Sequence, residues 1–221
     1  MKLIAENTQS TVVSVSEHNP SKRVAYQSEA QLEEALLKQL ENQGYERLDA
    51  NTEEELITNL RYQLEQLNDI KFTDDEWNFF FNTHIANKKA TLKDIAKLLH
   101  DDRSAQLTFP REDGHYQNIK LIDKRAIHQN HLQVIHQYTP TGGRRKNRYD
   151  VTILVNGIPM VHVELKKRGV AIREAFNQIG RYQRESFTAD CGLFKYLQLF
   201  VISNGTETKY YSNTTRDKSE I

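Results

Sequence analysis

The first half of the chain repeats its apolar positions with the period of a helix. Between residues 28 and 100, leucines and aromatic residues recur three or four positions apart, which predicts successive amphipathic helices. Three of these stripes begin with a capping-box pattern, a Ser or Thr followed three residues later by Gln or Glu: Ser28 with Gln31, Thr52 with Glu55, and Thr73 with Glu76. A shorter helix is expected over 92–100. A helix-rich region over about 28–100 is therefore predicted.

The pattern changes to short, β-prone segments near Phe109. Strands are expected within residues 116–123 and 131–138, and residues 149–169 predict two strands joined at Asn156-Gly157. A helix over about 171–187 and a last strand pair around Asn204-Gly205 follow. This order predicts an α/β (α+β-like) fold with a mixed central β-sheet flanked by helices. We interpret residues 1–221 as one domain, with its sheet-containing core over about 109–213.

Composition excludes several classes of protein. The single cysteine, Cys191, excludes a disulfide framework and a cysteine-built zinc or iron–sulfur site. The start of the chain has no long apolar segment, and no apolar run approaches 18 residues, so a cytoplasmic location without a membrane span is expected. The formal net charge is zero, but residues 28–76 carry an excess of ten negative charges and residues 141–185 an excess of six positive charges. The second half therefore favours an anionic partner.

Candidate chemistry lies on the strand expected over residues 158–166. Side chains alternate along a strand, so Glu164 and Lys166 project from one face and the apolar residues from the other. Asp150 opens the preceding strand. A regular two-residue turn at Asn156-Gly157 would place Asp150 on the opposite face, whereas one β-bulge would place it beside Glu164. Because Pro159 cannot donate a ladder hydrogen bond, we predict such an irregularity.

In that register, two carboxylates lie side by side with a lysine one step further on. Hard oxygen ligands of this kind suit Mg²⁺ or Mn²⁺, which can polarise a phosphoryl oxygen, while Lys166 would orient water and stabilise developing charge. Gln178 and Tyr182 share one face of the following helix, and the other stripe is expected to face the core: Ile172, Phe176 and Ile179. His162 shares the face of Glu164 and is expected to be a surface histidine, with a place in the lining of the site as the alternative. The pattern indicates phosphodiester hydrolysis.

The spacing of Asp150, Glu164-Leu165-Lys166 and Gln178-x-x-x-Tyr182 resembles the PD-(D/E)xK nuclease superfamily in its RecB-like branch. The segment over residues 148–169, RYDVTILVNGIPMVHVELKKRG, more specifically resembles the nuclease domain of the restriction (R, or HsdR) subunit of type I restriction–modification enzymes. The resemblance implies a restriction-endonuclease-like core, with Asp150, Glu164 and the carbonyl of Leu165 as Mg²⁺ (or Mn²⁺) ligands. It implies a catalytic role for Lys166, with Gln178 and Tyr182 as an accessory motif. Tyr149 stands where the motif name has proline.

The same resemblance suggests that an acid of the first helix, Glu29 or Glu33, approaches the site. Phosphate contacts with double-stranded DNA are expected from the basic loop before Asp150 and from the residues after Glu164: Arg144, Arg145, Lys146, Arg148, Lys167, Arg168 and Arg173. Nothing in the sequence resembles a base-reading motif.

Restriction subunits of this family are ATP-driven translocases that work with modification and specificity subunits. The sequence has no phosphate-binding G-x-x-x-x-G-K-[ST] loop, so the chain is interpreted as the nuclease part of a longer motor subunit, to which any ATP dependence would belong. Two alternatives stay open at this point. The first is another RecB-like nuclease of repair or recombination, and the second is a non-catalytic DNA-binding or assembly module.

Overall fold

The computed structural model describes residues 5–7, 10–12, 28–100, 106–140, 147–187 and 192–213. Its centre is a six-stranded sheet in the order β10-β9-β8-β7-β6-β3. The strands are β3 (Glu46–Arg47), β6 (Leu132–Tyr138), β7 (Tyr149–Val155), β8 (Ile158–Leu165), β9 (Leu199–Ser203) and β10 (Thr208–Ser212). Pairs β3–β6 and β8–β9 are parallel and the others antiparallel, which confirms the predicted mixed sheet. Two separate ribbons pair β1 (Ala5–Asn7) with β2 (Ser10–Val12), and β4 (Gln106–Pro110) with β5 (Tyr116–Lys120).

Each of the three helices predicted from a capping box begins directly after its N-cap residue. The helices are α1 (Glu29–Asn42), α2 (Glu53–Asn68), α3 (Asp74–Phe80), α4 (Leu92–His100) and α5 (Ile172–Glu185). A π-helical turn (Phe81–Ile85) continues α3, and 3₁₀ turns cover Ile127–Gln129 and Leu193–Tyr196. The capping boxes at Ser28, Thr52 and Thr73 are all formed, so local hydrogen bonds fix these helix starts. Within the described ranges, no helix has the length and apolar character needed to cross a membrane.

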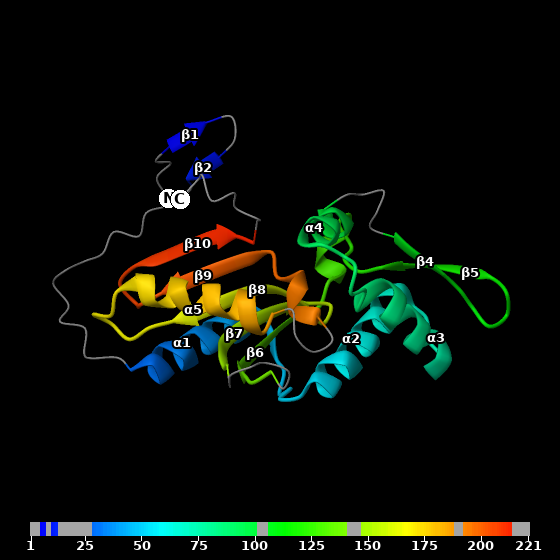
Figure 1. Ribbon diagram of the computed structural model, residues 1–221, viewed down its shortest axis with the longest axis horizontal. Coiled ribbons are helices and arrows are strands. Elements are labelled where there is room, and N and C mark those ends of the chain that lie inside the picture. Colours follow the sequence, from blue (N-terminus) through cyan, green and yellow to red (C-terminus); the bar gives the residue numbers. More distant parts are fainter. Residues whose placement is uncertain are drawn as a thin grey trace.

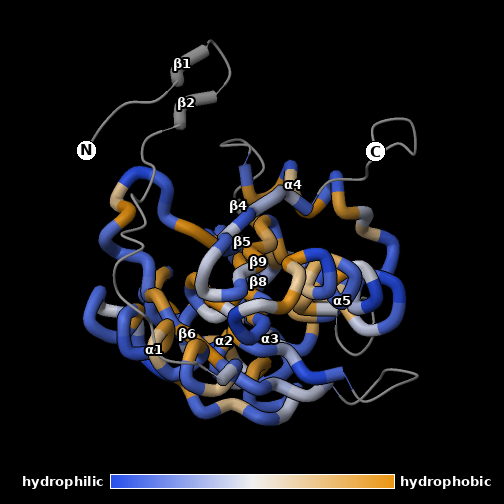
Figure 2. The backbone as a smooth tube through the Cα atoms, turned by 90° about the vertical axis from the view of Figure 1, so that its left-hand side faces the viewer, coloured by the Kyte–Doolittle hydropathy of each residue, from blue (hydrophilic) through white to orange (hydrophobic). Residues whose placement is uncertain are grey.

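Helices cover both faces of the sheet (Figure 1). On one face, Leu37 and Leu40 of α1 pack against Val134, Val163 and their neighbours. A larger core on the other side combines residues of α2, α3, α4 and α5 with the sheet, and Figure 2 shows the hydrophobic strand segments in the interior. Both faces of β8 are therefore buried, which the sequence pattern had predicted for only one of them.

The buried stripe of α5 differs from the predicted one. Ala175, Ile179 and Tyr182 are buried, whereas Phe176 is 40% exposed and lies with its ring 5.2 Å from that of Tyr211. The prediction that Phe176 belongs to the core side was wrong. Ala175 of the buried stripe lies in the core, and Phe176 follows it about 100° further round the helix, which places the phenyl ring at the rim beside Tyr211.

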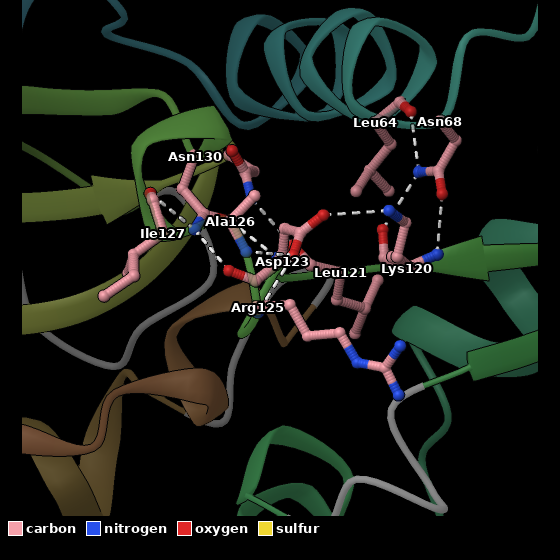
Figure 3. A network of polar contacts seen from close by, with 10 residues as sticks. Leu64, Asn68, Lys120, Leu121, Asp123, Arg125, Ala126, Ile127 and Asn130 are labelled. Carbon is pink, nitrogen blue, oxygen red and sulfur yellow. Dashed lines mark hydrogen bonds and ion pairs between the residues drawn. The ribbon is translucent and has the colours of Figure 1, made fainter.

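A polar network holds the turn end of the β7–β8 hairpin to the helical region (Figure 3). Asn68 of α2 pairs with the backbone N–H and C=O of Lys120, and Asn130 links the backbone of Asp123 to the amide of Asn156. Asp123 Oδ1 accepts the backbone N–H groups of Arg125 and Ala126 at 3.0 and 2.8 Å. These contacts tie the β5–β6 connection to α2 and to the hairpin.

Replacing Asp123 with Ala is expected to lower the midpoint of urea unfolding more than replacing it with Asn, since Asn keeps an oxygen for the two N–H groups. The N–H of Ala126 and then Lys120 lower the pKa of Asp123 to about 2. The carboxylate therefore adds stability that is complete above about pH 4, the pKa of an unfolded Asp, and that is lost as the pH falls towards 2. Urea titrations at pH 7 and pH 2.5 check both statements. Equal midpoints for the two variants at pH 7 would contradict the role of the backbone contacts.

Candidate active site

The register of the β7–β8 hairpin determines which side chains meet. Near the turn, Val155 pairs with Ile158 and Leu154 with Pro159, but beyond it Ile153 pairs with Val161 and Val151 with Val163. Met160 is thus the extra residue of a β-bulge, and the predicted irregularity beside Pro159 is confirmed. Beyond the last pair, this register brings Asp150 close to Glu164: Asp150 Oδ2 accepts the N–H of Leu165, and the charge of Glu164 acts on the Asp150 carboxyl.

Glu164 is fully buried and is held at both carboxylate oxygens. The ammonium of Lys166 lies 3.0 Å from Oε1, and Nε2 of His162 lies 3.3 Å from Oε2. Lys166 itself is fixed by its backbone N–H, which donates to the carbonyl of Ser203 on the parallel strand β9. His162 is completely buried, so its interpretation as a surface histidine was wrong. The reason is that α5 and the turns beyond it cover this face of β8.

Asp150 is a partly buried carboxyl close to a second acid. Burial, and then the negative charge of Glu164, raise its pKa to about 7, while the N–H of Leu165, which donates to Oδ2 at 2.8 Å, opposes the shift. Near neutral pH the free site therefore binds a proton for part of the time. A cation between the two carboxylates would remove the repulsion that raises this pKa.

The donor set fits a hard divalent cation. Asp150 and Glu164 supply carboxylate oxygens, the ligands that Mg²⁺ and Mn²⁺ prefer. Across the described ranges, no three His, Cys, Asp or Glu side chains converge as a metal-binding group. Two carboxylates are nevertheless a sufficient protein share for Mg²⁺, which keeps several waters. The role predicted for the carbonyl of Leu165 stays a prediction.

Gln178 and Tyr182 connect to the site through the backbone of Arg148, the residue before β7. The amide of Gln178 donates to the phenol oxygen of Tyr182, which donates to the carbonyl of Arg148 at 2.8 Å. Burial and the charge of Glu164 raise the pKa of Tyr182 to about 12, so the phenol keeps its proton at neutral pH. This chain attaches α5 to the residues directly before Asp150. The contacts indicate a positioning role, because neither side chain is hydrogen-bonded to a carboxylate of the pair.

Both acids proposed from the first helix lie near the pair. The Glu29 carboxylate accepts the N–H of Lys167 at 3.2 Å. Glu33 is buried, lies 3.2 Å from His136 Nδ1 and accepts the amide of Gln137, and its charge contributes to the raised pKa of Asp150. A cavity of about 350 Å³ is lined by residues of α1, β6 and β7: Glu29, Ala30, Glu33, Glu34, Leu37, His136, Gln137, Arg148 and Asp150.

Sequence reasoning missed Gln137. It is a non-glycine residue at φ +55° in β6, between the pairs His136–Val151 and Tyr138–Tyr149, and so lies across from Asp150. Such left-handed backbone costs energy and is concentrated at functional sites. The alternation of polar and apolar residues along β6 did not indicate this role, because a polar residue near the end of a strand is usually interpreted as facing solvent.

The basic residues expected to contact DNA fall into three groups. Arg144, Arg145 and Lys146 lie outside the described residues. Arg148, Lys167 and Arg173 are exposed, and Arg148 lines the cavity beside Asp150. Arg168 differs from these, because its guanidinium donates to the carbonyl of Gly205 at 2.9 Å and so supports the β9–β10 loop.

Comparison with known proteins identifies relatives over almost all of this chain. The family model described as "Type I restriction enzyme R protein N terminus" matches residues 26–219. The "Type I restriction enzyme EcoprrI endonuclease subunit" of Escherichia coli is 48% identical over 224 residues, which cover 100% of this chain and 70% of that protein. The "Type I restriction enzyme SauMSSORF170P endonuclease subunit" of Staphylococcus aureus (strain MSSA476) is 40% identical over 195 residues, 86% of this chain and 20% of that protein.

A more distant similarity covers part of the chain. The "Putative type I restriction enzyme MjaIXP endonuclease subunit" of Methanocaldococcus jannaschii is 34% identical over 103 residues, which make up 44% of this chain and 9% of that protein. The matched region is thus a small fraction of both the staphylococcal and the archaeal relative.

Proposed function

The chain belongs to the family of type I restriction enzyme R protein N-terminal regions, and from this premise we propose that it is a nuclease domain that hydrolyses phosphodiester bonds of double-stranded DNA. The proposed reaction depends on Mg²⁺ or Mn²⁺. The observation that carries the proposal is the proximity of Asp150 to Glu164 beyond the bulge of the hairpin, with the Lys166 ammonium 3.0 Å from Glu164. The printed names of the relatives, which describe endonuclease subunits, support it.

In the proposed site, Asp150 and Glu164 would hold the cation, which would polarise a phosphoryl oxygen and favour hydroxide formation. Asp150 would serve as a ligand in its deprotonated form, because a metal ligand must be deprotonated. Lys166, held at 3.0 Å from Glu164, keeps its ammonium at the site, where it orients water and stabilises charge on the phosphate. Gln178 and Tyr182 keep the start of β7 in place through the carbonyl of Arg148.

The longer protein is proposed to act as the motor subunit of a restriction complex. ATP-driven translocation would be performed by regions outside this chain, and modification and specificity subunits would select the target. The exposed Arg148, Lys167 and Arg173, of which Arg148 lines the cavity beside Asp150, would contact backbone phosphates without reading sequence. In this proposal the domain cleaves DNA and has no sequence preference of its own.

Calorimetric titration with Mn²⁺ tests the site directly. The wild-type chain is expected to bind, and Asp150→Ala and Glu164→Ala are expected to weaken binding by more than about 100-fold, since the loss of a direct ligand exceeds the 10–100-fold cost of losing a supporting residue. Glu54→Ala, which removes an exposed acid of α2, is the matched control.

Circular dichroism establishes that each variant is folded. Equal Mn²⁺ affinity of the wild type and both site variants would remove the metal-dependent nuclease from consideration and favour a non-catalytic DNA-binding module. Cleavage of supercoiled plasmid is then measured with the full-length subunit and its partners, with the same two substitutions expected to abolish it.

A further inference from the structure

His162 lies on β8, an inner strand of the sheet, two residues before Glu164. Its side chain is completely buried and is surrounded by the rings of Tyr149, Tyr182 and Phe187, whose centroids lie 5.5–5.9 Å from that of the imidazole. Both ring nitrogens nevertheless have polar neighbours. Nδ1 lies 3.3 Å from Thr152 Oγ1 on β7, and Nε2 lies 3.3 Å from Glu164 Oε2.

The chemistry of these groups assigns the proton positions. As a metal ligand Glu164 would have to be a carboxylate, which can only accept hydrogen bonds, so in the proposed site Nε2 carries the hydrogen that faces Glu164. In the neutral ring Nδ1 is then the acceptor, and the hydroxyl of Thr152 donates to it. The result is a directed chain from Thr152 through His162 to Glu164.

This chain determines the orientation of Glu164. Lys166 holds one carboxylate oxygen and His162 holds the other, so rotation of the carboxylate is restricted from both sides. A buried imidazole costs free energy in apolar surroundings unless its nitrogens are hydrogen-bonded, and an aliphatic residue would fill the same space among the rings without that cost. The imidazole at this position is therefore explained by its two hydrogen bonds and not by space filling.

We propose that His162, backed by Thr152, is a positioning residue that holds Glu164 in the orientation in which it shares a divalent cation with Asp150. The inference rests on the proposed function, because it assigns Glu164 as a ligand. It adds a supporting pair of residues to the site, in the manner in which partners of metal ligands fix ligand geometry.

Three substitutions of His162 separate positioning from space filling. The amide nitrogen of Gln lies near the position of Nε2, whereas that of Asn lies near the position of Nδ1, and Leu offers neither. In calorimetry with Mn²⁺ alone, His162→Gln is expected to stay within about threefold of the wild-type affinity, and His162→Asn and His162→Leu are expected to lose about 10–100-fold. Thr152→Ser and Thr152→Val form a second pair, in which only Val is expected to weaken binding.

The outcomes distinguish this inference from the proposed function. Unchanged Mn²⁺ affinity in folded His162→Asn and His162→Leu overturns the inference alone. A wild-type chain that binds no Mn²⁺ overturns the proposed function and this inference with it. If the variants do not fold, ¹⁵N NMR of the metal-free wild type decides: hydrogen at Nε2 supports the inference, and the Nδ1–H tautomer overturns it.

Discussion

Gly157→Ala is expected to destabilise the chain by about 2–5 kcal/mol, combining the cost of left-handed backbone with that of an overpacked contact. Gly157 has φ +79° in the β7–β8 turn, and a Cβ there would lie 2.8 Å from Cα of Leu60 and 3.2 Å from its nitrogen. These are backbone atoms in the middle of α2, so relief requires the helix to move away from the sheet. Urea unfolding measures the change.

Gly114→Ala is the matched control. Gly114 has φ +85°, close to that of Gly157, but a Cβ at this position meets nothing within 4 Å. Only the conformational cost of about 1–2 kcal/mol is expected there. Equal losses of stability in the two variants would show that α2 does not press on the turn.

The second large effect concerns Asp150. Asp150→Asn is expected to stabilise the metal-free chain at pH 8 by on the order of 2–4 kcal/mol, with almost no effect near pH 4. The Asn keeps an oxygen for the N–H of Leu165 but carries no charge beside Glu164. A site that would bind a cation is thus expected to cost stability when the cation is missing.

The sign follows from the raised pKa. Burial and Glu164 place the pKa of folded Asp150 at about 7, against an ordinary value of 3.8, so the folded chain binds more protons than the unfolded chain between these values. Stability of the wild type therefore falls as the pH rises from about 4 to 7 and levels off above, at roughly 1.4 kcal/mol per pKa unit before allowance for solvent and for the shared repulsion.

Urea titrations in EDTA at pH 4 and pH 8 measure this difference. Glu207→Gln, which removes an exposed negative charge near β10, gives the baseline. Saturating Mn²⁺ is expected to reverse the order of wild type and Asp150→Asn, because the cation stabilises the chain that binds it. A stability difference independent of pH would contradict the raised pKa.

Features determined by neighbouring residues could be predicted from the sequence. The capping boxes at Ser28, Thr52 and Thr73 need only a side chain and the N–H groups three residues away, so they form wherever the helix forms. The bulge near Pro159 was predictable for a different reason. With a regular turn, Asp150 and Glu164 would lie on opposite faces of the sheet and could not share a cation. Pro159 cannot donate a ladder hydrogen bond, so an irregularity was expected beside it.

Features determined by contacts between distant segments were not predictable. The burial of His162 depends on α5 and Phe187 covering a face that alternation alone describes as polar. The position of Phe176 depends on which face of α5 packs on the sheet, and its neighbour Tyr211 comes from β10. The contacts of Glu33 with His136 and Gln137 join α1 to β6 across more than 100 residues, and no spacing in the sequence relates them.

The bulge at Met160 also separates two requirements that one hairpin must meet. Residues between the turn and the bulge follow one parity of pairing, which suits Asn156-Gly157 and the contact with α2. Residues beyond it follow the other parity, which brings Asp150 to Glu164. The pairing register at the turn is thus independent of the register at the two acids. Sequence changes at the turn can therefore be accommodated without moving the acids. Deletion of Met160, in contrast, would shift the pairing by one residue, and the side chains of β8 beyond the bulge would then point to the opposite face of the sheet.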